Sequence, residues 1–107
     1  MDLVELVYDS TRTWPTSELY GLTNQVRRAS VSIPANIAEG QGRASTKEFL
    51  HHLSIARGSL LEVETHLLIA QRLGYLQIET ANRLLSHSDE VSRLVSGLSR
   101  SLLDKTT

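Results

Sequence analysis

Apolar residues recur at helical spacing along most of the chain and predict four helices. The clearest stripe lies in the third helix, where the apolar positions are separated by alternating steps of four and three residues: Phe49, Leu53, Ala56, Leu60, Val63 and Leu67. Such a seam is typical of a helix that packs lengthwise in a bundle. Ser45 with Glu48 three residues later forms a capping box that predicts where this helix begins, and Gly74 predicts its end.

Weaker stripes predict a helix on each side of this region. Residues 2–12 form a short first helix, and a fourth is expected over residues 77–103, followed by a frayed tail at residues 104–107. The seam of the fourth helix again uses steps of three and four: Ala81, Leu84, Ser88, Val91, Val95, Leu98 and Leu102. No alternating β-branched pattern predicts a strand. The short link at residues 40–44 indicates that the second and third helices are antiparallel.

The second helix begins near residue 18 or 22, ends at residue 39, and carries apolar residues on two faces. One stripe consists of Leu22, Val26, Ala29, Ile33 and Ile37. Val31, Ala35 and Ala38 lie on the opposite side, flanked by Arg27 and Arg28. Because a small bundle covers only one face of a helix, we expect the second face to contact a neighbouring chain, and the two arginines are candidates for the same interface. The alternative is that the alanines are good helix formers in solvent.

Two further residues carry specific structural expectations. Trp14 precedes Pro15 in the first connection, and we expect its ring to fold back as a lid over the end of the bundle. Pro34 lies inside the second helix, where its missing N–H and its ring predict a kink or a loosened turn.

Composition restricts the class of protein. The chain has 107 residues, no cysteine and a net charge of −1, which predicts one domain over residues 1–107 without disulfides or thiolate metal sites. No stretch has the length and hydrophobicity of a signal peptide or membrane span, so we expect a soluble cytoplasmic protein that does not associate with membranes. The net charge argues against a general affinity for nucleic acid.

The charge is nevertheless unevenly distributed. Between residues 25 and 47, the acidic Glu39 stands alone against four basic residues: Arg27, Arg28, Arg43 and Lys47. These four are the candidates for contact with the phosphates of nucleic acid. For Arg27 and Arg28, a contact with a neighbouring subunit is equally compatible with the sequence.

Little in the chain points to catalysis or to a bound cofactor. Its four histidines do not have the spacing of a metal motif, and no nucleophile signature is present, so we expect no catalytic residue, no metal site and no cofactor. The Gly-rich link at residues 40–43 precedes a helix N-terminus and could hold a phosphate, although a simple turn capped by Ser45 is favoured. Three polar residues close to the apolar stripes are candidates for a buried polar network that fixes the register of helices or subunits: Asn36, Arg57 and Glu64.

Several short motifs carry a family resemblance over residues 18–76. They are Tyr20-Gly21-Leu22-Thr23, Gln25-x-Arg27-Arg28-Ala29, Ser32-Ile33-Pro34-Ala35-Asn36-Ile37-Ala38-Glu39-Gly40, Gly42-Arg43 and Leu73-Gly74-Tyr75. With these motifs at these spacings, the chain resembles the 23S rRNA intervening-sequence protein family, also called the four-helix-bundle protein family.

The resemblance implies an all-α, antiparallel up-down four-helix bundle that assembles as a homopentameric ring in a bacterium. It implies no enzymatic activity. A distantly similar group assists reverse transcriptases of diversity-generating retroelements by binding the polymerase and nucleic acid through a basic ring. We therefore expect a non-enzymatic oligomeric scaffold or binding module whose partner is a protein, RNA or DNA. The alternative is a purely structural homo-oligomer.

Three features depart from the family pattern. The first helix is one or two turns shorter than is typical, which should leave one edge of the bundle less well covered. Thr16 stands where a lysine is common, and Gln41 stands where an aromatic residue is usual. The missing lysine weakens the case for nucleic-acid binding.

Overall fold

The computed structural model describes residues 2–106, which form four α-helices and one 3-10 turn and contain no strand. The elements are α1 (Asp2–Thr11), η1 (Thr16–Glu18), α2 (Leu22–Gln41), α3 (Thr46–Arg72) and α4 (Ile78–Thr106). The predicted all-α fold with four helices is therefore confirmed. Ser45 caps α3 as predicted, since its hydroxyl accepts the Glu48 N–H at 3.1 Å.

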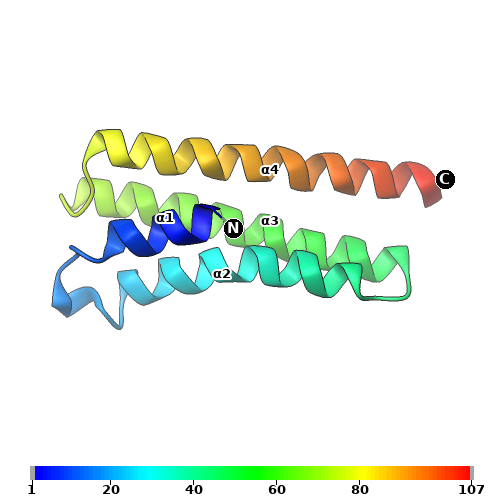
Figure 1. Cartoon of the computed structure of the whole chain (residues 1–107), viewed down its shortest axis with the longest axis horizontal. Coiled ribbons are helices and arrows are strands. Elements are labelled where there is room, and N and C mark those ends of the chain that lie inside the picture. Colours follow the sequence, from blue (N-terminus) through cyan, green and yellow to red (C-terminus); the bar gives the residue numbers. More distant parts are fainter. Residues whose placement is uncertain (1, 107) are drawn as a thin grey trace.

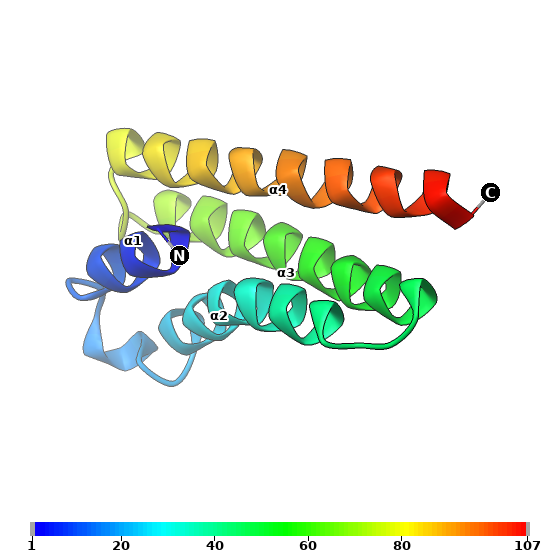
Figure 2. The same ribbon diagram turned by 45° about the vertical axis from the view of Figure 1, so that its right-hand side comes forward.

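The helices lie lengthwise in an elongated molecule of 48 × 24 × 18 Å (Figure 1). Along the chain, α2 runs towards one end of the molecule, α3 returns beside it and α4 runs back again (Figures 1 and 2). The central helix α3 packs on both α2 and α4, while α1 packs on the same two helices over a shorter length. Because α1 has 10 residues and α4 has 29, one half of the molecule has four helices and the other half has three.

The core follows the predicted stripes. Its fully buried side chains include Val26 and Ile33 of α2, Leu53, Leu60, Val63 and Leu67 of α3, and Leu84 and Val95 of α4. Trp14 is 6% exposed and packs against Tyr75 with 6.1 Å between ring centroids, so it covers the bundle end as expected. The Tyr75 hydroxyl donates to Glu18 Oε2 at 3.0 Å, and this bond raises the pKa of the phenol.

Two predicted helix ends are wrong. The fourth helix continues to Thr106, so the expected fraying of residues 104–106 is not observed, and Thr107 lies outside the described residues. The second helix passes through Gly40 and ends at Gln41.

Pro34 does not interrupt α2, because a proline removes only one hydrogen bond from a long helix held by tertiary packing.

Gly40 remains helical because α2 and α3 approach each other closely there. A Cβ atom at this position would lie 2.8 Å from Phe49 Cδ1 and 2.9 Å from His52 Cβ, both on α3. Gly40, which the sequence pattern alone marks as a helix stop, therefore allows α2 and α3 to pack closely.

We predict that Gly40→Ala destabilises the protein by about 1–3 kcal/mol, because the added methyl group must displace an aromatic ring and a backbone-linked carbon. Gly97→Ala in α4 is the matched control, since a Cβ there meets nothing within 4 Å. The Gly97→Ala substitution should raise the free energy of unfolding by about 0.5–1 kcal/mol, because alanine has a higher helix propensity than glycine. Urea unfolding measures both changes, and a Gly40→Ala protein as stable as Gly97→Ala would contradict the close approach.

Candidate functional site

The outer face of α2 is apolar and exposed within one chain. Val31 is 42% exposed, and Ala35 and Ala38 are exposed beside it. They lie on the side of the helix opposite to the buried Val26 and Ile33. The second apolar face predicted from the sequence is therefore present, and no other part of the described chain covers it.

The adjacent arginines of α2 have different environments. Arg27 is half-buried against α1, where its Nε donates to Thr11 Oγ1 at 2.8 Å and its guanidinium lies 4.8 Å from the centroid of the Tyr8 ring. Arg28 is exposed and lines a shallow polar hollow between α2 and α3 together with Glu62. Arg27 thus connects α1 to α2, and Arg28 remains at the surface beside the apolar face.

The other two basic candidates lie at the far end of α2. Arg43 Nη2 is 2.7 Å from Glu39 Oε1, and both side chains are about half exposed. Lys47 is exposed in a hollow of about 540 Å³ that Ser45 and His51 also line. Since 16 residues separate Arg27 from Arg43, at 1.5 Å per helical residue the two pairs stand roughly 24 Å apart along the axis. The four basic residues therefore do not form one patch.

The predicted polar network does not form as one unit. Asn36 is part-buried and accepts from His52 Nδ1 at 3.1 Å, which joins α2 to α3. Glu64 accepts from Ser88 Oγ at 3.1 Å, which joins α3 to α4. Arg57 is exposed within one chain, so it takes no part in a buried network there, and its contact with another subunit stays a prediction. A long arginine at the edge of a seam extends its charged group into water, where it needs no buried partner.

Asn36 belongs instead to a row of hydrogen bonds between α2 and α3 that the sequence analysis did not identify. Ser59 Oγ donates to Ser32 Oγ at 2.9 Å, and His66 Nε2 lies 2.8 Å from Gln25 Oε1. His52 and His66 thus support the packing of α3 on α2.

Among the described residues, no group of three or more histidine, cysteine, aspartate or glutamate side chains could hold a metal ion. No described helix is long and apolar enough to cross a membrane.

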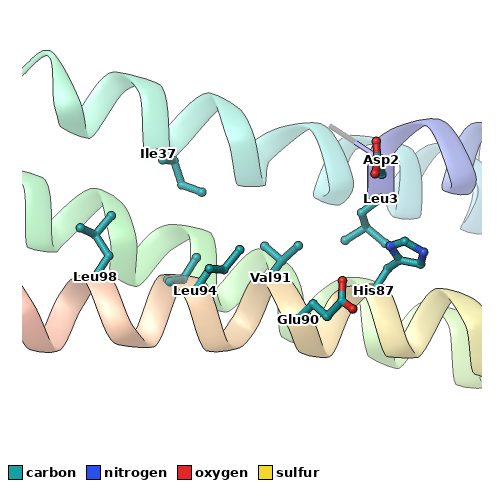
Figure 3. A pocket seen from close by; sticks show the side chains of 9 residues that line it. Asp2, Leu3, Ile37, His87, Glu90, Val91, Leu94 and Leu98 are labelled. Carbon is teal, nitrogen blue, oxygen red and sulfur yellow. The ribbon is translucent and has the colours of Figure 1, made fainter.

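An apolar groove lies beside the start of α1. It is located between α2 and α4, has a volume of about 340 Å³, and is shown in Figure 3. Its apolar lining consists of Leu3, Ile37, Val91, Leu94, Val95 and Leu98. Leu94 is 73% exposed. The uncovered edge expected from the short first helix is therefore observed.

We predict that Arg27→Ala lowers the free energy of unfolding by about 2–4 kcal/mol, the combined size of a charge-assisted hydrogen bond and a cation–π contact. Arg28→Ala is the matched control and should change it by less than about 0.5 kcal/mol in a separated subunit. Urea unfolding at low protein concentration distinguishes them. Equal losses for the two variants would show that Arg27 does not anchor α1.

Comparison with known proteins agrees with this architecture. The family model described as 23S rRNA-intervening sequence protein matches residues 1–97. A solved structure of a protein of unknown function from the S23 ribosomal protein family of Bacteroides thetaiotaomicron is similar, with a TM-score of 0.82 and 24% sequence identity. The similarity covers 92% of this chain and 88% of that one, and at this identity it supports the fold alone. No curated protein matched the chain.

The family match extends over all four helices, including most of α4, and the resemblance noted in the short motifs lies within it. The chain therefore belongs to the 23S rRNA-intervening sequence protein family.

Proposed function

We propose that the chain is the subunit of a homopentameric ring that acts as a non-enzymatic scaffold or binding module in the bacterial cytoplasm. The observation that carries the proposal is the exposed apolar face of α2, formed by Val31, Ala35 and Ala38. Two of these side chains are single methyl groups, so a helix of a neighbouring subunit can approach the backbone of α2 closely. In the antiparallel bundle that we propose, this face runs along the outside of each subunit.

The surroundings of this face support its use as an interface. Arg28 and the Glu39–Arg43 ion pair lie next to it, which gives an apolar centre with a charged margin. Protein interfaces commonly have this arrangement, because the centre excludes water while the margin stays hydrated. Arg57 is exposed on α3 and remains available for a contact between subunits.

The non-enzymatic part of the proposal rests on how the polar side chains are used. His52 and His66, which could have served as general bases, instead join α3 to α2 through Asn36 and Gln25. A base committed to helix packing is poorly placed to exchange protons with a substrate. We therefore assign the molecule a role in binding and assembly.

We predict that light scattering will give a mass about five times the subunit mass of 11.9 kDa. Val31→Glu should reduce the mass to that of smaller species, because a buried carboxylate without a partner costs several kcal/mol. Leu61→Glu is the matched control, since Leu61 is also exposed, at 64%, but lies on α3. A stable monomer at high concentration, or a Val31→Glu protein with unchanged mass, would refute the ring.

Nucleic-acid binding is the second candidate function. It rests on Lys47 and Arg43, which share one hollow and would be repeated around a ring. The charge balance opposes it, since Arg27 is held by α1 and Arg43 by Glu39. We consequently favour a protein partner over RNA or DNA, and we retain the purely structural homo-oligomer as the remaining alternative.

We predict only weak binding of single-stranded RNA, with a dissociation constant above about 10 μM at 50 mM salt, because the net charge is −1 and the four basic candidates do not form one patch. Fluorescence anisotropy with labelled RNA measures it. Tight binding that falls steeply with salt and is weakened by Lys47→Ala, but not by Arg72→Ala, would instead establish the nucleic-acid function. Both substituted side chains are exposed on α3.

A further inference from the structure

A small hollow lies where the chain passes from α1 to α2, at the left-hand end of the molecule in Figure 1. We call it the Trp14 hollow. It is lined by residues of the end of α1, of the connection with η1 and of the first turns of α2, and its volume is about 140 Å³. Pockets for drug-sized molecules measure about 300–1,000 Å³, so this hollow suits a much smaller ligand.

Two buried polar groups of the Trp14 hollow have no hydrogen-bond partner in the protein. They are Nε1 of Trp14 and Oγ1 of Thr23, which belong to residues only 6% and 3% exposed. No other buried side-chain nitrogen or oxygen atom in the described part of the chain lacks a partner. Because an unpaired buried polar group destabilises a fold, two of them on one hollow point to a ligand that supplies hydrogen-bond acceptors.

The charged groups of the hollow favour an anion. Arg27 donates through Nε to Thr11 Oγ1 at 2.8 Å, and its two Nη groups make no hydrogen bond to the described part of the chain. Arg12 is a second lining cation. No acidic side chain is among the described residues that line the hollow. Guanidinium groups bind carboxylates and phosphates through paired N–H donors, so an oxyanion matches this set of side chains.

The rest of the lining distinguishes between these two oxyanions. The Trp14 ring, Pro15 and Leu19 add carbon surface to the hollow. A phosphate carries oxygen on every side and would turn some of its oxygens towards that surface, which costs free energy. A carboxylate on a short aliphatic chain has oxygens at one end and carbon at the other, so it can satisfy both parts of the lining.

We propose that the Trp14 hollow binds a small carboxylate with a short aliphatic chain. Its oxygens accept from the Trp14 N–H, the Thr23 hydroxyl and the Arg27 guanidinium, and its carbon atoms contact Pro15 and Leu19. This binding goes beyond the proposed scaffold function. It does not depend on the ring, because every residue involved belongs to one subunit.

The two unpaired atoms are closed to solvent, so the carboxylate reaches them only when part of the lining moves. Arg12 is the side chain best placed to do so, since it is 74% exposed and its ion pair with Asp9 is also at the surface. Exposed ion pairs of this kind contribute little to stability. Displacement of Arg12 therefore opens the hollow without disturbing the core.

The indole N–H of Trp14 reports directly on binding. The chain contains one tryptophan, so tryptophan labelled with ¹⁵N gives a single indole cross-peak in the NMR spectrum of the full-length protein. Sodium propionate should move this peak downfield to saturation, with half-saturation at about 1–10 mM, a range that so small a ligand can reach. Propionamide has nearly the same shape but no charge, and it should bind at least about tenfold more weakly. Sodium chloride at the same ionic strength should leave the peak in place.

A free acid and the glutamate side chain of another protein carry the same chemical group. N-acetylglutamate α-amide in the same titration distinguishes these two sources. Weaker binding than propionate identifies a free short-chain acid as the ligand, and tighter binding identifies a protein side chain.

Substitutions test the individual donors. Thr23→Val keeps the shape of the side chain and should weaken propionate binding by about fivefold, without lowering the melting temperature, because the hydroxyl that it removes has no partner in the protein. Thr65→Val, at an exposed position of α3, is its matched control. Arg27→Gln should weaken binding by about tenfold or more, whereas Arg28→Gln should bind like the unchanged protein. Circular dichroism verifies that each variant folds, and Thr23→Val tests the site even if Arg27→Gln does not.

Three results would overturn the proposal: no saturable shift up to about 50 mM propionate, an equal response to propionamide, or unchanged binding by Thr23→Val. An indole peak that moves with protein concentration alone would make a neighbouring subunit the occupant, and the proposal would fail. The fate of the ring is a separate result, because a monomer that binds propionate through Thr23 would refute the ring and support the site.

Discussion

Burial of the apolar seam of α3 between α2 and α4 is the interaction on which the rest of the molecule depends. Leu53, Leu60, Val63 and Leu67 are almost fully inaccessible to solvent and connect the two outer helices. Because α2 and α4 each pack along α3, their positions relative to one another depend mainly on α3, and α1 connects the same two helices over a shorter length. Disrupting the seam would therefore displace α2 together with its exposed outer face.

Apolar side chains stay exposed on two surfaces of the molecule, and these have different causes. The outer face of α2 lies away from the core altogether, whereas the groove at Leu94 lies where α1 ends. A face of small residues suits a close helix contact between identical subunits, which is the assembly proposed above.

The local signals in the sequence predicted the helices well. The capping box at Ser45 and the seam of α3 depend only on neighbouring residues, and both are observed. The end of α2 was misplaced because Gly40 is a local stop signal that close packing with Phe49 overrides. The tail of α4 stays helical to Thr106, although its position at the end of the chain predicted fraying.

The candidate site was less predictable because it depends on how the helices are placed against each other. Arg27 and Arg28 are neighbours in sequence, but their environments differ because of where α1 lies. Arg27 is hydrogen-bonded to Thr11 of α1, and Arg28 is exposed. The hydrogen bonds of His52 and His66 depend on how α2 and α3 are aligned lengthwise. The periodicity of a single helix carries no information on that alignment. Arg57 lies close to the apolar stripe of α3, but a long side chain in such a position can extend into solvent, so closeness to the stripe does not make it buried.

The central claim is that another chain covers the outer face of α2, and thiol labelling tests it most directly. The chain contains no cysteine, so Ala35→Cys and Leu61→Cys each introduce a single thiol. Both positions are exposed in one subunit. Covering by a neighbour predicts much slower reaction of the thiol at position 35 than at position 61 in the native assembly, and equal rates once the protein is unfolded. Equal rates in the native protein would contradict the account.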